Sequence, residues 1–136
     1  MQYFQTKLTV RIGDMNYGGH LANDKTLLYF HEARIRYFRE LGITEGNIGD
    51  NIALTQTEAY IKYTGEAFLG DELLIKVHVD DITRARFRVN YEITRIGDEK
   101  SIATGYTVLA GFDYSSKKLK RIPQSFRDKV TKFQGV

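Results

Sequence analysis

The distribution of apolar residues restricts this chain to one long helix followed by a run of strands. From Asp24 to Leu41, apolar side chains recur at steps of three and four and predict a helix of about 27 Å. Its buried stripe is expected to consist of Thr26, Phe30, Ala33, Tyr37 and Leu41. Asn23 is a suitable N-cap, and Gly42 suits the position after the last turn.

Apolar and polar residues alternate in other segments with the two-residue period of strands. One strand is expected before the helix, at Thr6–Ile12, followed by the turn-rich segment Gly13–His20. After the helix we expect strands at Ala53–Tyr63, Glu72–Asp80, Arg84–Arg95 and Ser101–Asp113. Short links favour antiparallel pairing of consecutive strands, and one face of their sheet needs the helix as cover. The sequence therefore predicts an α+β fold in which a curved antiparallel sheet wraps around one central helix.

The same pattern predicts self-association. One helix is too small to cover a sheet of this many strands, and the long strands leave an edge exposed. We therefore expect a homodimer, or a dimer of dimers, whose sheets join edge to edge.

Length and composition exclude several classes of protein. The 136 residues fit a single domain, 1–136, and the absence of Cys excludes disulfides, a thiolate nucleophile and a cysteine zinc site. His31 and His78 are isolated, so no metal site is expected. No apolar run approaches the ~18 residues of a membrane span, and the start lacks a basic and then apolar leader. We expect no membrane segment, no signal peptide and a cytoplasmic location.

Positive charge is concentrated at the C-terminus. The net charge is +3, yet residues 117–136 contain seven basic residues and a single acid, Asp128. A solvated, partly frayed basic tail is the simpler expectation, and contact with an anion such as a phosphate is the alternative. Pro123 is expected to open a short terminal helix. The basic residues are not interleaved with aromatic ones in the pattern of a nucleic-acid groove, so no nucleic-acid partner is expected.

The segment before the long helix and the helix itself carry a recognisable pattern. The first reads Asp14-Met15-Asn16-Tyr17-Gly18-Gly19-His20-Leu21-Ala22-Asn23, and the second contains Tyr29-Phe30-His31-Glu32-Ala33-Arg34. Further on come Tyr63 and then Gly70-Asp71-Glu72-Leu73. This order and spacing resemble the hotdog-fold acyl-CoA thioesterases, and among them the 4-hydroxybenzoyl-CoA thioesterase-like branch. The resemblance extends to about Pro123. It implies a hotdog fold and hydrolysis of an acyl-CoA or acyl-carrier-protein thioester, with no cofactor.

The chain departs from the family pattern at Asn16. The family has its second Asp there, often the catalytic carboxylate, and an amide can act neither as a base nor as a nucleophile. The resemblance therefore implies a hydrogen-bonding role in the site for Asn16, with an Asx turn as the structural alternative. Plant acyl-carrier-protein thioesterases use an Asp, an Asn and a His in this loop. Those positions fall on Asn16, Gly18 and His20, and the His alone is retained.

Candidate catalytic residues cluster where the loop meets the helix. Thioester hydrolysis builds negative charge on the carbonyl oxygen, which free N–H groups at a helix N-terminus can stabilise. The backbone N–H near Asn23 is the candidate oxyanion hole, and Gly18 and Gly19 allow close approach of the backbone. His20 is the candidate for activating water, weighed equally against a structural role in the loop. Asp24 is the alternative base, although an acid in the first turn more commonly complements the helix dipole.

Candidate substrate-binding residues extend along the chain: Tyr17, Gly18, Gly19, Tyr63, Thr64, Arg84, Arg86 and Arg88. Tyr63 and Thr64, like Glu58 and Glu66, could reach a site across a dimer interface, although ordinary strand-end chemistry is simpler for each. The three arginines could bind the phosphates of coenzyme A. A solvated outer face beside Asp80 or Glu92 is the simpler interpretation.

Two other functions remain open at this stage. Non-catalytic binding of acyl-CoA is consistent with the amide at Asn16. An enoyl-CoA hydratase-like enzyme is a weaker alternative, because Gly13-Asp14-Met15-Asn16 followed by His20 only loosely resembles the motif Gly-Asp-x-Asn-Pro-x-His. One extra residue and the missing Pro put the required Asp and His at the wrong spacing.

Overall fold

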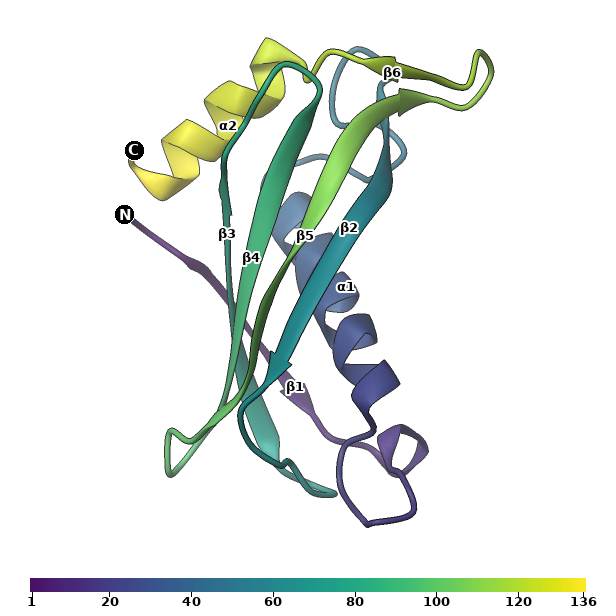
Figure 1. Cartoon of the computed structure of the whole chain (residues 1–136). Coiled ribbons are helices and arrows are strands. Elements are labelled where there is room, and N and C mark those ends of the chain that lie inside the picture. The colour runs from purple at the N-terminus through teal and green to yellow at the C-terminus, as the bar shows by residue number, and fades with distance from the viewer.

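One antiparallel sheet curves around the helix α1 (Asn23–Glu40) in the computed structural model, which describes all residues 1–136 (Figure 1). The other elements are β1 (Phe4–Thr9), the short 3₁₀ helix η1 (Ile12–Asp14), β2 (Ala53–Tyr63), β3 (Glu72–Asp80), β4 (Arg86–Arg95), β5 (Ser101–Asp113), β6 (Lys118–Lys120) and α2 (Gln124–Gln134). The strand order is β1-β3-β4-β5-β2, and β6 pairs with the end of β5. The predicted α+β class and its curved sheet around one long helix are confirmed.

The central helix is held by the apolar stripe that its sequence predicts. Phe30, Ala33 and Tyr37 are completely buried, and Thr26 and Leu41 are nearly so. The Phe30 ring stacks on Tyr91 of β4 with 4.3 Å between ring centroids. Residue 105 must be glycine for this approach, because a Cβ there would lie 2.9 Å from the Phe30 ring and 2.1 Å from a main-chain oxygen of β2. Gly105 therefore allows α1 to pack closely against the sheet.

Two strands differ from their predicted bounds. The first strand ends at Thr9, because the chain turns into η1 and leaves Ile12 exposed instead of pointing to the core. The fourth begins at Arg86, because a turn in which the Thr83 N–H donates to the Arg86 carbonyl precedes it. Strands β2, β3 and β5 have the bounds that the alternation predicts.

The basic C-terminal segment is folded, so the expectation of a frayed tail is wrong. Pro123 does precede a helix, as predicted, and α2 packs its buried side chains Phe126, Val130 and Gln134 against the sheet. Phe126 lies 4.6 Å from Phe87 of β4 between ring centroids. Charge had suggested solvation, but the apolar residues at helical spacing decide the outcome. The sheet thus has a second helical cover beside α1 (Figure 1).

A buried amide joins α2 to the rest of the fold. The Gln134 side chain accepts hydrogen bonds from the Tyr37 hydroxyl (2.8 Å) and the Val79 N–H (2.7 Å), and donates to the Val79 carbonyl (2.9 Å). Burial raises the pKa of Tyr37 above its usual range, so the hydroxyl keeps the proton that it donates. One side chain thereby satisfies three buried polar groups.

Replacing that amide is expected to destabilise the whole domain. Gln134→Ala leaves buried donors and acceptors unpaired and should lower the free energy of unfolding by about 1–3 kcal/mol. Urea unfolding measures the loss. Gln124→Ala removes an exposed amide from the same helix and should stay within about 0.5 kcal/mol of wild type. Equal losses in the two variants would contradict the role assigned to Gln134.

Candidate active site

A carboxylate ties the loop before α1 to the helix itself. Asp14 accepts a hydrogen bond from the Tyr29 hydroxyl (2.5 Å), and its main-chain oxygen accepts one from the Ala22 N–H (2.9 Å). Burial, together with the hydrogen bond to Asp14, raises the pKa of Tyr29 well above its usual range. Tyr29 therefore remains a donor, and the loop is anchored at both of its ends.

Asn16 closes the loop on itself. Its side-chain oxygen accepts hydrogen bonds from the N–H groups of Gly18 (2.9 Å) and His20 (3.3 Å). Two N–H donors on one atom identify that atom as the amide oxygen, so the amide NH₂ faces the His20 ring, where Nδ2 lies 3.5 Å from Nδ1. The Asx-turn interpretation of Asn16 therefore fits its contacts.

This contact favours one tautomer of a neutral His20 ring. In a neutral imidazole, a nitrogen that accepts a hydrogen bond leaves the proton on the other nitrogen. With Nδ1 facing the Asn16 amide, Nε2 is the N–H, and it lies 3.8 Å from a carboxylate oxygen of Glu66. Gly18 makes room for the ring, because a Cβ at that position would lie 2.7 Å from Nε2. In this tautomer, His20 presents a hydrogen-bond donor toward Glu66.

The first turn of α1 has free N–H groups, although its cap differs from the prediction. Ala22 is the N-cap and Asn23 the first helical residue, with no side-chain hydrogen bond at the cap. The Lys25 N–H donates to the Ala22 carbonyl, whereas the N–H groups of Asn23 and Asp24 have no acceptor. The Tyr63 hydroxyl donates to the Asn23 carbonyl (2.9 Å) and joins the end of β2 to this turn.

A cavity of about 290 Å³ lies between the loop, the start of α1 and the end of β2. Its polar lining comes from His20, Asn23, Thr26, Tyr63 and Glu66. Leu21, Ala67 and Ile102 line the apolar part. Donors at one side, a carboxylate at its rim and an apolar remainder could accommodate a polarised carbonyl with an apolar substituent.

Arg95 of β4 holds the segment after β2 in place. Its guanidinium donates to the Glu66 carbonyl (2.9 Å), to Asp71 (3.3 Å) and to Asp98 (2.8 Å). The hydrogen bond from Arg95 lowers the pKa of Asp98 to about 2. The Leu21 N–H donates to the Ala67 carbonyl (2.8 Å) from the other side. The backbone at the rim of the cavity is therefore fixed from both sides.

Comparison with known proteins shows the family of this chain. Residues 10–130 match the family model described as the thioesterase-like superfamily. The chain belongs to the thioesterase-like superfamily. The predicted hotdog thioesterase family is thereby confirmed, and with it, at the level of the family, the predicted thioester hydrolysis.

Individual thioesterase-like relatives cover almost the whole chain. The 1,4-dihydroxy-2-naphthoyl-CoA hydrolase of Synechococcus elongatus is 24% identical over 94% of this chain and 95% of its own length. The structure of a 1,4-dihydroxy-2-naphthoyl-CoA thioesterase from Synechocystis is similar with a TM-score of 0.86 at 23% identity, covering 95% of this chain and 96% of its own. A Thermus thermophilus thioesterase complexed with coenzyme A and Zn has a TM-score of 0.84 at 24% identity, over 97% and 94% of the two chains.

Neither a cluster of metal-binding side chains nor a membrane-spanning helix is found in this chain. No three or more His, Cys, Asp and Glu side chains are grouped in a way that could hold a metal ion. Neither helix combines the length and the apolar character needed to cross a membrane.

Several predicted site residues lie outside the cavity. The Tyr17 side chain is fully exposed, and Thr64 instead bonds Ser101 through its hydroxyl (2.6 Å). Asp24 is exposed, and neither it nor Asn16 is part of the lining. Gly18 and Gly19 shape the loop, Gly18 by leaving space for the His20 ring and Gly19 through its positive φ of 81°.

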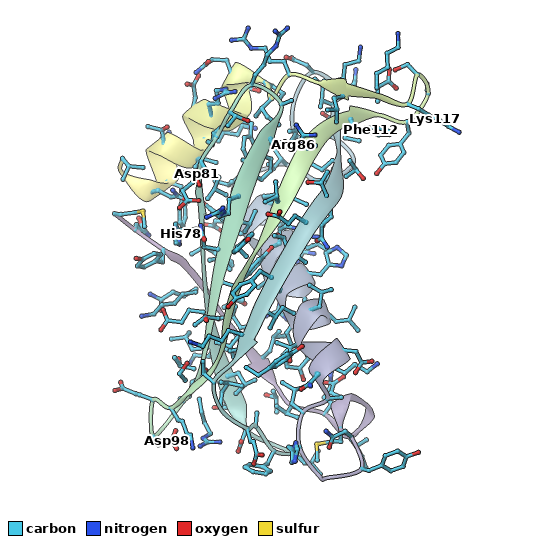
Figure 2. The ribbon with its side chains drawn as sticks, viewed as in Figure 1. His78, Asp81, Arg86, Asp98, Phe112 and Lys117 are labelled. Carbon is cyan, nitrogen blue, oxygen red and sulfur yellow. The ribbon has the colours of Figure 1, made fainter.

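The three predicted arginines lie toward the other end of the chain's fold. Arg86 stands at the end of the sheet where β4 begins, close to Phe112, whereas the loop before α1 lies at the opposite end (Figures 1 and 2). Arg84 precedes β4 at that same end. Arg88 pairs with Asp81 (3.6 Å) and covers the Tyr106 ring at 4.3 Å. Within one chain, these arginines and His20 form no common site.

The cavity also contains Glu66, which follows the break at Gly65. From sequence it could reach a site across a dimer interface, with ordinary strand-end chemistry as the simpler interpretation; the structure places it beside His20 of the same chain. A Cβ on Gly65 would lie 2.3 Å from the Ser101 carbonyl, so this glycine lets the segment lie against β5. The Leu21 N–H bond to the Ala67 carbonyl and the bridge between His20 and Phe68 bring Glu66 to His20.

The tautomer of His20 offers a direct test of the loop geometry. Asn16→Asp keeps an oxygen for the two N–H groups but removes the donor to Nδ1, so Nδ1 should take the proton and donate to the carboxylate. ¹⁵N NMR of the neutral imidazole should show the proton on Nε2 in wild type and on Nδ1 in the variant. Asn51→Asp, outside the cavity, should leave the His20 signals unchanged. A wild-type proton on Nδ1 would contradict the contact with Asn16.

Proposed function

We propose that this cavity is where the protein hydrolyses acyl-CoA thioesters. The observation that carries the proposal is the first turn of α1, where the N–H groups of Asn23 and Asp24 have no acceptor and Asn23 lines the cavity beside His20. A thioester carbonyl oxygen in the cavity would gain these donors as it becomes an oxyanion. The positive end of the helix dipole adds to the same stabilisation.

His20 then acts as a hydrogen-bond donor in this site. Its Nε2–H can bind the carbonyl oxygen or orient the Glu66 carboxylate, and the Asn16 amide keeps the ring in that tautomer. Asn16 thus acts on the substrate through His20 and needs no carboxylate of its own. The departure from the family pattern at this position is therefore compatible with an active enzyme.

Acyl-CoA hydrolysis can be measured on this chain without background. Because the protein has no Cys, a thiol reagent detects only the coenzyme A that is released. We expect release from a panel of 1,4-dihydroxy-2-naphthoyl-CoA, 4-hydroxybenzoyl-CoA and octanoyl-CoA, the first chosen because relatives carry that activity. His20→Ala should lower kcat by roughly 10²–10³, the scale for loss of one oxyanion donor. His31→Ala serves as the control.

Two results would decide against this proposal. Binding of coenzyme A with no thiol release from any of the three would make the protein a non-catalytic binder. Release that is unchanged in His20→Ala would leave His20 a structural residue of the loop.

We also propose that two copies join through β2. This 11-residue strand is an edge of the sheet, contains no Pro, and has largely exposed side chains between Gln56 and Tyr60. An unpaired edge of this length offers its N–H and C=O groups to a second chain. A two-fold axis near the middle of β2 would continue one sheet into the other.

Such a dimer would also bring the predicted substrate-binding arginines of one chain near the cavity of the other. Strand β2 starts near the end of the sheet that carries Arg86 and ends at Tyr63, about 33 Å away. Antiparallel pairing of two β2 strands would bring the arginine-rich end of one protomer to the cavity of the other. Arg84, Arg86 and the basic β6 strand could then contact the phosphates of coenzyme A.

Sedimentation equilibrium tests the assembly. We expect twice the 15.7 kDa chain mass for wild type at micromolar concentration. Ala59→Lys, in the middle of the exposed part of β2, should shift the equilibrium to monomer through like-charge repulsion. Gln5→Lys, on the opposite edge strand β1, should leave the dimer intact. A folded wild-type monomer would overturn the proposed pairing.

A further inference from the structure

We propose that Glu66 is the general base of the hydrolysis, a role that rests on the function proposed above. Thioester hydrolysis needs a group that takes a proton from water. Asn16 is an amide, and His20 presents Nε2–H to the cavity while Nδ1 faces Asn16. Neither of these loop residues can accept the proton in that state.

Glu66 is the one carboxylate among the cavity-lining residues. Asp14 is occupied by Tyr29 and by the Arg11 N–H, and Asp24 is exposed outside the lining. The Glu66 side chain has no acceptor or donor within hydrogen-bond distance and is 63% exposed, so it can reach a water molecule in the cavity. His20 is its one ion-pair partner within 4 Å, at 3.8 Å, and Tyr63 is the other titratable side chain that lines the cavity.

The backbone of Glu66 is held although its side chain is free. Arg95 donates to the Glu66 carbonyl (2.9 Å), and the N–H of the preceding Gly65 donates to the Ile102 carbonyl (3.1 Å). The following Ala67 accepts the Leu21 N–H (2.8 Å). The positive charge of Arg95 faces Asp71 and Asp98, which leaves the carboxylate of Glu66 unpaired with it. These bonds fix the backbone that carries the base without neutralising its carboxylate.

The reaction balances with water as the only co-substrate. Water forms the new C–O bond as Glu66 takes one of its protons, and the carbonyl electrons move to the oxygen beside the Asn23 N–H. Collapse of this tetrahedral intermediate breaks the C–S bond, and the leaving thiolate receives the proton from Glu66. The products are the carboxylic acid and coenzyme A, and Glu66 returns to its carboxylate form.

The Glu66 carboxylate can be removed without changing the shape of the side chain. Glu66→Gln should lower kcat by roughly 10²–10⁴ on the same thioester panel, with little change in KM. The acidic limb of the kcat profile against pH should also disappear, because no base remains to be protonated. Glu66→Asp should recover part of the rate. Glu40→Gln, at the other end of α1, is the matched control and should keep wild-type turnover. Coenzyme A binding by calorimetry and thermal unfolding should be unchanged in all three variants.

The outcomes distinguish the role of Glu66 as the base from the proposed thioester hydrolysis on which it rests. An active wild type with unchanged kcat and pH profile in Glu66→Gln would overturn the role of Glu66 alone. A wild type that releases no thiol would overturn the proposed hydrolysis and this role together. A fall in kcat with the acidic limb retained would show that Glu66 acts on binding or structure and not as the base.

Discussion

The burial of α1 inside the sheet is the constraint on which the rest of the structure depends. An 18-residue helix with Phe30, Ala33 and Tyr37 completely buried can occupy only one position on the concave face. That position aims its N-terminus at the end of β2 and at the segment after it. The loop from Asp14 to His20 must then close over the same end, because Asp14 is bonded to the helix through Tyr29.

A buried charge fixes the rotation of that helix. The Arg34 guanidinium, almost fully buried, donates to Tyr91 of β4, Thr107 of β5 and Gln56 of β2, and pairs with Glu45 at 3.3 Å. Burial raises the pKa of Tyr91, so its hydroxyl stays neutral beside the cation. Desolvation offsets much of the attraction in such a pair. The main effect of the network is therefore on register, since a rotated α1 would leave the cation without its partners.

Local patterns were sufficient to predict the elements, and long-range pairing was needed for the site. Periodicity correctly predicts α1 and three strand bounds, and Pro123 predicts the helix that follows it, because these depend on neighbours in sequence. Charge was misleading for the C-terminal segment, where seven basic residues suggested solvation but Phe126 and Gln134 are buried against elements distant in sequence. The oxyanion candidate at Asn23 and the importance of His20 come from the loop motif. Glu66 has no such motif, because its approach to His20 depends on contacts between segments about 45 residues apart, the Leu21 N–H bond to Ala67 and the bridge between His20 and Phe68.

In the proposed site, the amide at Asn16 changes which residue can donate and which can accept a proton. A carboxylate at this position would accept a hydrogen bond from Nδ1–H of His20, which would leave Nε2 unprotonated and able to act as a base. The amide does the reverse, because its oxygen is held by two backbone N–H groups and its NH₂ faces Nδ1. His20 then points a donor into the cavity, and a proton acceptor has to come from a different element. The Glu66 carboxylate lies 3.8 Å from the His20 ring, on the segment after β2 that Arg95 holds by a hydrogen bond. It meets that requirement. One substitution in the loop is therefore consistent with a site whose base lies on the segment after β2.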